Sequence, residues 1–232
     1  QMEKEELGEK QVAEGEEERG WIIREFLDVG LSLEAVSNHC LQYIVAGRDT
    51  TAHALTWTLY LILRNPSSLM RIQSEIQAVP PSIRNADLAP HLPFLEAVIT
   101  EALRLFPPVP SNIYENISTE DIALPDGPII KPGEVIVYSA LVNGRCPASW
   151  GDDADDFRPE RWLGKENPSA YESLVFNGGG KTCPGQSKAR AELLITMREI
   201  LARYEISMGW NGSDRRGAVG LSMPMIRGLP IR

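Results

Sequence analysis

From Leu33 to Arg64, apolar side chains recur at the three- and four-residue spacing of an α-helix. Ser32 precedes this stretch as a good N-cap, and Glu34 suits the positive end of the helix dipole. The pair Asn65-Pro66 ends the pattern. A helix of this length extends for roughly 48 Å at 1.5 Å per residue, far beyond the usual helix. We therefore expect it to cross the centre of the domain.

Proline and glycine divide the rest of the chain into shorter elements. The pattern predicts three further helices, from Pro66 to about Ala78 with Asn65 as cap, from about Pro93 to before Pro107-Pro108, and from about Pro184 to about Tyr204. Between Ile113 and Val142, short apolar runs alternate with turn pairs, which indicates a small antiparallel sheet. Residues 144–182 are mostly turns, and long irregular stretches tend to be functional or to wrap something. With a short β pair at the end, the predicted fold class is mainly α with a minor antiparallel β-sheet.

The charge of the chain is concentrated at its beginning. Residues 1–20 carry −5 of the net charge of −9, and we expect this Glu-rich stretch to be a solvated or disordered arm. The remainder is near balance and shows no basic patch, so we expect no nucleic-acid partner. No apolar run is long enough to span a bilayer and no signal peptide is visible, so we expect no membrane segment in this chain. The three cysteines are widely spaced, which indicates a reducing compartment rather than disulfides or a zinc site.

The segment FNGGGKTCPGQ, residues 176–186, places Cys183 in backbone with few side chains. A phosphate-binding P-loop would need a glycine where Val175 stands, so that motif fails. A phosphate-binding nucleophile would need an arginine inside the loop, but Arg190 lies within the following helix. A cysteine protease would need a histidine, and His39, His53 and His91 all lie far upstream. Proximity to one of them in space stays open.

Ligation of haem iron by the Cys183 thiolate explains each neighbour of the cysteine. Glycines let a backbone approach a flat macrocycle, and the positive end of the following helix stabilises an anion. Phe176 would cover the sulfur, and Lys181 would point toward the carboxylates at the ring edge. The residues by themselves leave one alternative open, which is that Cys183 is an inert, small apolar side chain.

Two more segments carry candidate chemistry. The long helix contains AGRDTTAH, residues 46–53, and its weak helix formers indicate either a harmless kink or a groove. In the second interpretation Gly47 opens space for a flat ligand, the Thr50 hydroxyl donates to bound oxygen, and Asp49 exchanges protons with water. Glu101 and Arg104 share a helix face, where the common outcome is a weak surface pair. Arg161, in FRPERW, would instead join them in a buried cluster that pins the irregular stretch to this helix.

Taken in this order, the segments resemble the motifs of the cytochrome P450 family of haem-thiolate monooxygenases. The cysteine-loop motif of the family, Phe-x-x-Gly-x-Arg-x-Cys-x-Gly, matches at Phe176, Gly179, Cys183 and Gly185. The remaining motifs match at Ala46, Gly47, Asp49, Thr50 and Thr51, at Glu101 and Arg104, and at Phe157 and Pro159 to Trp162. Three positions depart from the family pattern: Lys181 and Tyr114 stand where an Arg is usual, and Gly144 stands where many members have His.

The resemblance implies that residues 21–232 form the haem-binding C-terminal half of a cytochrome P450 domain. Haem b would be ligated by Cys183 and contacted by Phe176, Gly179, Lys181, Gly185, Ala46 and Gly47, with Asp49 and Thr50 catalytic. It further implies hydroxylation of a small apolar substrate by O2, with electrons from NADPH through NADPH-cytochrome P450 reductase. AGRDTTA and FRPERW are similar to fungal and plant hydroxylases of alkanes or fatty acids. The substrate would contact the chain near Ala46 and at residues 108–113 and 219–222.

The implied location is the endoplasmic reticulum membrane, with the anchor outside this chain, or otherwise the cytoplasm. The alternative is a truncated, non-catalytic remnant that keeps the haem-site motifs without activity. A carbon monoxide difference spectrum distinguishes the two.

Overall fold

The structure is a computed structural model that describes residues 22–125, 127–164, 169–209 and 215–232. The acidic arm expected at residues 1–20 lies outside the described residues. The chain divides into two compact units, with the boundary in the sequence between Val45 and Ala46. In the first unit, the Phe26 ring lies 5.3 Å from the His39 ring and 6.3 Å from the Tyr43 ring. All the candidate site residues belong to the second unit.

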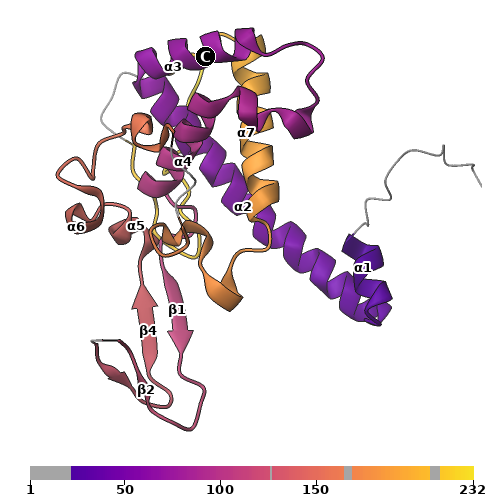
Figure 1. Cartoon of the computed structure of the whole chain (residues 1–232), viewed down its shortest axis with the longest axis vertical. Helices are drawn as coiled ribbons and strands as arrows, with labels where there is room; N and C mark the ends of the chain where they lie inside the picture. The colour runs from indigo at the N-terminus through magenta and orange to yellow at the C-terminus, as the bar shows by residue number, and fades with distance from the viewer. Residues whose placement is uncertain (1–21, 126, 165–168, 210–214) are drawn as a thin grey trace, which may run out of the picture. The chain divides into compact units, whose positions relative to one another are not determined.

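The described elements confirm a mainly helical fold with minor antiparallel sheets (Figure 1). The helices are α1 (Ile22–Asp28), α2 (Leu33–Arg64), α3 (Pro66–Ala78), α4 (Pro93–Leu105), α5 (Ala140–Asn143), α6 (Pro147–Trp150) and α7 (Gln186–Arg203). The strands are β1 (Asn112–Glu115), β2 (Ile122–Ala123), β3 (Ile129–Ile130) and β4 (Val135–Tyr138). Short 3₁₀ turns lie at Asn85–Asp87, Ala89–His91, Pro159–Trp162, Leu174–Phe176 and Gly179–Lys181. None of the described helices is both long and apolar enough to cross a membrane.

The cap of α3 differs from the sequence expectation, and α4 has an acceptor from another helix. Asn65 precedes α3, but its side chain makes no cap; its amide instead donates to the Leu61 carbonyl at 2.7 Å. The expectation of an Asn65 side-chain cap was therefore wrong. α4 is capped from a distance, because the Glu75 carboxylate accepts from the amides of Phe94 at 2.7 Å and Leu95 at 3.0 Å. This contact supplies acceptors for two amides at the start of the helix.

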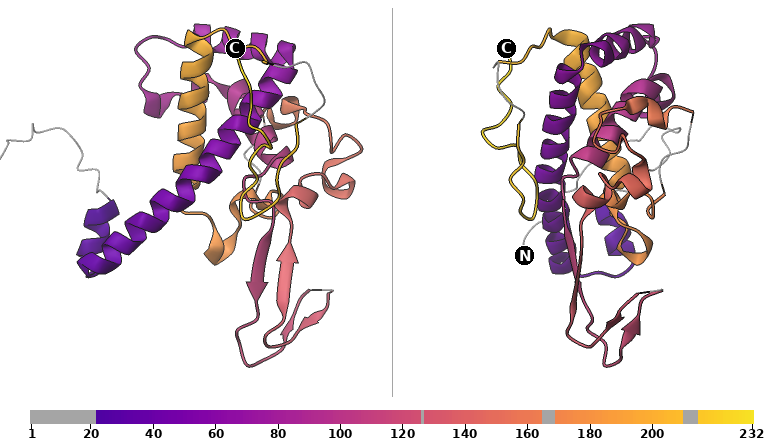
Figure 2. Two further views of the ribbon diagram at one scale, coloured as in Figure 1. Left: turned by 180° about the vertical axis from the view of Figure 1, so that it is seen from behind. Right: turned by 90° about the vertical axis from the view of Figure 1, so that its left-hand side faces the viewer.

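The main core lies where α3, α4 and α7 gather around the C-terminal part of α2 (Figures 1 and 2). It is filled by aliphatic side chains that are almost fully buried, including Ile62, Ile72, Leu95, Ile99, Leu193 and Met197. A second cluster surrounds Trp57, whose ring stacks on Phe106 at 4.1 Å and whose Nε1 donates to the Met223 carbonyl at 3.0 Å. These contacts hold the last segment of the chain against α2.

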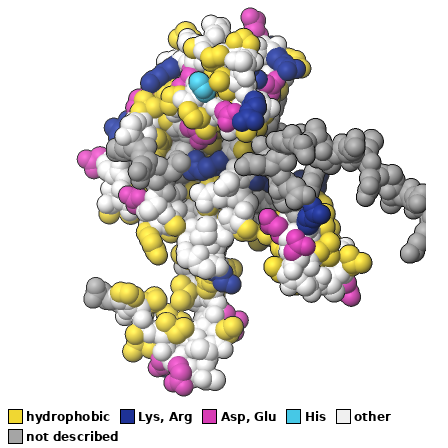
Figure 3. Space-filling model, turned by 45° about the vertical axis from the view of Figure 1, so that its right-hand side comes forward, with side chains coloured by type: hydrophobic (Ala, Val, Ile, Leu, Met, Phe, Trp, Pro, Cys, Tyr) yellow, Lys and Arg dark blue, Asp and Glu magenta, His cyan; other side chains and the backbone are white. Residues whose placement is uncertain are grey.

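Two small antiparallel pairs make up the β structure. β1 pairs with β4, with Asn112 opposite Tyr138, and β2 pairs with β3. Ile113, Val135 and Val137 of the first pair are exposed, and yellow side chains gather in the lower part of Figure 3, where the two strand pairs lie. In place of the β pair expected at the end of the chain, the described residues show two isolated bridges, Met208–Ile231 and Gly217–Met225.

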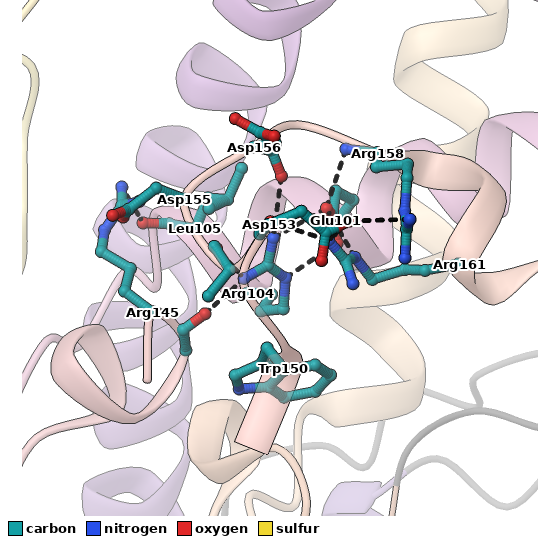
Figure 4. Close-up of polar contacts among 12 residues, drawn as sticks. Glu101, Arg104, Leu105, Arg145, Trp150, Asp153, Asp155, Asp156, Arg158 and Arg161 are labelled. Atoms are coloured by element: carbon teal, nitrogen blue, oxygen red, sulfur yellow. Dashed lines mark hydrogen bonds and ion pairs between the residues drawn. The ribbon is translucent and has the colours of Figure 1, made fainter. Parts of the chain in front are cut away.

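The Glu101 carboxylate on α4 is fully buried and accepts five hydrogen bonds (Figure 4). Nε and Nη2 of Arg104 donate to it at 2.9 and 2.8 Å. The remaining donors come from the irregular stretch: the Arg158 amide at 2.9 Å, Arg161 Nε at 3.0 Å and Trp162 Nε1 at 2.8 Å. The buried cluster of Glu101, Arg104 and Arg161 is confirmed, and the weak surface pair is excluded.

Arg104 uses all five of its N–H donors inside this cluster. Two donate to Glu101, and the other three donate to the carbonyls of Gly144, Ala154 and Asp156. Position 144 must be glycine for the backbone there to lie this close to α4, since a Cβ would lie 2.2 Å from the Arg104 carbonyl oxygen. The irregular stretch is therefore held to α4 by paired and fully hydrogen-bonded charges.

Glu101→Gln is expected to lower the free energy of unfolding by about 3–5 kcal/mol, because the new amide presents N–H donors to the donors of Arg104, Arg161 and Trp162. Urea denaturation followed by circular dichroism measures this change. Glu160→Gln is the matched control: its side chain is 53% exposed and accepts one bond from Arg71 at 3.2 Å. This control should change the stability by about 1 kcal/mol or less. Equal losses in the two variants would contradict the structural role of Glu101.

Candidate functional site

Cys183 lies in the loop between the turn Leu174–Phe176 and α7, the orange segment that precedes α7 in Figure 1. Its thiol is free and partly exposed. The Cys183 amide donates to the Phe176 carbonyl at 2.8 Å, so the loop returns on itself and brings these two predicted residues together. A Cβ on Gly185 would lie 3.8 Å from the sulfur, which shows that this glycine also borders the thiol.

The backbone between Phe176 and Cys183 is shaped by two left-handed residues. Asn177 has φ 57° and Gly179 has φ 58°. Side chains added at Gly179 or Gly180 would meet no atom within 4 Å, whereas one added at Gly178 would lie 2.9 Å from the Ala170 Cβ. The loop is therefore packed at Gly178 and open at the two glycines that follow. Lys181 is exposed.

Phe176 is partly buried and packs against the core beneath the loop. The Arg190 guanidinium of α7 lies 5.7 Å from the centre of its ring. Arg190 also donates to the Thr100 hydroxyl at 3.2 Å and lies 3.7 Å from the Glu96 carboxylate of α4. Burial lowers the pKa of Arg190 and raises the pKa of Glu96, and their mutual attraction opposes both shifts. Sequence reasoning missed this support because nothing near Arg190 in the chain indicates a partner on α4.

Ala46, Gly47, Asp49 and Thr50 lie within α2. The Thr50 hydroxyl donates to the Ala46 carbonyl at 2.8 Å, one turn earlier in the same helix. The Asp49 carboxylate is 62% exposed and lies 3.8 Å from the Arg48 guanidinium. A Cβ on Gly47 would meet no atom within 4 Å. In the described part of the chain, no hydrogen bond or ion pair joins these four residues to the Cys183 loop.

Two of the residues that depart from the family pattern, Tyr114 and Gly144, and also Arg145 next to Gly144, have partners within the protein. Tyr114 stacks on Tyr138, with ring centroids 5.6 Å apart. Gly144 belongs to the Arg104 cluster described above. Arg145 donates to the Leu105 carbonyl at 2.8 Å and lies 5.0 Å from the centre of the Phe106 ring. Burial lowers the pKa of Arg145, and Asp155 opposes this shift.

The residues of the Cys183 loop fit a haem-thiolate site in three respects. It offers a partly exposed free thiol, backbone without side chains at Gly179 and Gly180, and a cation at Lys181. Among the described residues there is no group of three or more His, Cys, Asp or Glu that would hold a metal ion by itself. A macrocycle supplies the other four ligands of its iron, so a single thiolate suffices.

Comparison with known proteins supports the family resemblance of the sequence motifs. Residues 19–219 match the model of the family described as Cytochrome P450. Relatives include Cytochrome P450 86B1 of Arabidopsis thaliana, 33% identical over 83% of this chain and 37% of that protein. Cytochrome P450 94A1 of Vicia sativa is 31% identical over 98% and 45%, and Alkane hydroxylase MAH1 of Arabidopsis thaliana is 33% identical over 71% and 33%.

The chain thus spans less than half the length of these relatives. The match nevertheless includes every motif described above, from the middle of α2 to the loop before α7. The chain belongs to the cytochrome P450 family.

Proposed function

We propose that this chain binds haem b through the Cys183 thiolate and forms the oxygen-activating part of a monooxygenase. The observation that carries the proposal is the free, partly exposed thiol in a loop whose neighbouring glycines leave open space. Membership in a family of haem-thiolate enzymes supports it. When bound, haem with a thiolate ligand supplies the chemistry that cleaves the O–O bond of O2.

The residues of the loop would hold the group in distinct ways. Cys183 would be the only protein ligand to the iron, and Gly179 and Gly185 would admit the flat ring to the backbone. Phe176 would exclude water from the sulfur, and Arg190 keeps its ring in place from the α7 side. Lys181 would neutralise a carboxylate at the ring edge. Ala46 and Gly47 would form the opposite wall.

Thr50 and Asp49 would deliver protons to the site. The Thr50 hydroxyl has one proton, and it donates that proton to the Ala46 carbonyl. In this conformation the Thr50 oxygen is free only to accept a hydrogen bond from a bound molecule. The hydroxyl can donate to such a molecule only after it breaks its bond to the Ala46 carbonyl. Asp49 is exposed and so exchanges protons with solvent. In this proposal the proton moves from solvent to Asp49 and then through the Thr50 hydroxyl.

The proposed substrate is a small apolar molecule, with an alkane or a fatty acid as the leading class. One similar protein is named an alkane hydroxylase, which supports this choice. Residues 108–113 and 219–222, which we expect to contact the substrate, approach each other where the Met223 amide donates to the Pro108 carbonyl at 2.9 Å. Ile113, Val219 and Leu221 there expose apolar side chains. Electrons would come from NADPH through NADPH-cytochrome P450 reductase at the endoplasmic reticulum membrane.

The first test is the carbon monoxide difference spectrum of the purified chain loaded with haem. We expect a thiolate-type Soret band that Cys183→Ser abolishes, because serine offers no thiolate to the iron. Cys146→Ser removes a second free, partly buried thiol and should leave the band unchanged. Persistence of the band in Cys183→Ser would refute the ligand assignment. Absence of any band in the unmodified chain would support the non-catalytic remnant.

Thr50→Ala is expected to raise the hydrogen peroxide released per NADPH consumed, since oxygen would then be reduced without timely proton delivery. The measurement is the ratio of peroxide to NADPH with a P450 reductase present. Thr56→Ala is a matched control, because Thr56 makes the same bond to a carbonyl four residues earlier, also at 2.8 Å. The relay role of Thr50 is excluded if the two variants release peroxide equally.

Gly47→Ala should have opposite effects on the stability of α2 and on the affinity for haem. Alanine stabilises a helix interior by about 1 kcal/mol relative to glycine, and the added Cβ meets nothing in the chain. Against a bound ring the same methyl group would clash, so haem affinity should fall roughly tenfold. Haem titration and thermal unfolding measure the two effects. If Gly47→Ala binds haem as tightly as the unmodified chain, Gly47 does not contact the ring.

A further inference from the structure

One short hydrogen bond joins the Cys183 loop to the hairpin of β1 and β4. Tyr138, the last residue of β4, donates its hydroxyl proton to Oδ1 of Asn177 at 2.6 Å. Asn177 directly follows Phe176 in the cysteine loop. This bond is a direct side-chain link from the hairpin to the loop.

Asn177 needs such a contact because its backbone is left-handed, with φ 57°. Its ψ of −174° places it outside the left-handed helical region that asparagine tolerates, in a region that is essentially restricted to glycine. Conformations of this kind persist where surrounding structure holds them. In the same loop the Cys183 amide reaches back to the Phe176 carbonyl at 2.8 Å. The turn at Asn177 therefore determines where the chain carries the thiol.

Tyr138 is itself held in place by Tyr114. The two rings are diagonal neighbours across the strand pair, with centroids 5.6 Å apart and planes within 8° of parallel. Their hydroxyl oxygens are 3.4 Å apart. Burial, together with the Tyr114 hydroxyl, raises the pKa of Tyr138 to about 12. Its hydroxyl keeps its proton at neutral pH and remains a donor to Asn177.

We propose that Tyr138 is a positioning residue for the Cys183 thiolate, which it holds in place through Asn177. This inference rests on the proposed function, because the loop that Tyr138 holds is the one that would ligate the iron. Tyr138 does not touch the reacting atoms. Its contribution is to keep the loop in the conformation that presents the sulfur.

Tyr138→Phe tests the inference, since it keeps the ring and its stack on Tyr114 but removes the donor. With the haem-loaded chain, transfer of haem to an apoprotein acceptor should become about 3- to 10-fold faster, the usual worth of one hydrogen bond. A larger share of the reduced carbon monoxide complex should show the thiol-type instead of the thiolate-type band. Tyr204→Phe, which removes the hydroxyl of an exposed tyrosine, should change neither quantity.

A double-mutant cycle separates positioning from a general effect on the hairpin. Asn177→Gly removes the acceptor and also the cost of the left-handed backbone. Tyr138→Phe should therefore have little further effect on the band ratio or the transfer rate in the Asn177→Gly background. If Tyr138→Phe has the same effect in both backgrounds, or no effect in either, the inference is wrong.

Amide hydrogen exchange tests the inference without haem. Exchange at the Cys183 amide should be about 3- to 10-fold faster in Tyr138→Phe than in the unmodified chain, because the turn that aligns it with Phe176 loses its support. Unchanged exchange would overturn the inference. Faster exchange in a chain that shows no thiolate-type band would overturn the proposed function and leave the role of Tyr138 in holding the loop intact.

Discussion

The Glu101 carboxylate, buried in α4, accepts N–H donors from Arg104 and from three residues of the irregular stretch that follows β4. An isolated buried carboxylate would be costly, and these donors together with two arginine charges offset that cost. The cluster also matters for the backbone after α6, because residues 151–158 form neither helix nor strand. This part of the chain is held by two side chains of α4, Glu101 and Arg104.

The Cys183 loop has supports on both of its sides. On one side α7 packs Leu193 and Met197 into the core, and Arg190 holds the Phe176 ring from the same helix. On the other side Tyr138 of the hairpin holds Asn177. The loop itself is short of side chains that would pack. Its position therefore depends on its neighbours, whereas the open space at its glycines is a property of its own backbone.

The polar side chains of the candidate site on α2, Thr50 and Asp49, have their contacts within that helix or with solvent. The Thr50 hydroxyl is bonded to the Ala46 carbonyl, and Asp49 faces solvent beside Arg48. The helix therefore needs no ligand to complete its hydrogen bonds at this point. A proton relay through Thr50 requires exchange of one bond for another of the same kind, which is a small energetic step. Glycine at position 47 weakens the interior of α2, so the stability of the helix does not explain why this residue is there.

The sequence by itself determined the bounds of α2, α3 and α4, because proline and the apolar period act through bonds inside each helix. It also predicted the family, since the motifs are local patterns in a set order. The tertiary structure alone decided which partners those elements meet: Glu75 at the start of α4, Glu96 and Phe176 beside Arg190, and Tyr138 beside Asn177. These contacts join residues far apart in the chain. Each contact forms only after packing has placed two elements side by side. A local sequence pattern does not specify which distant elements become neighbours.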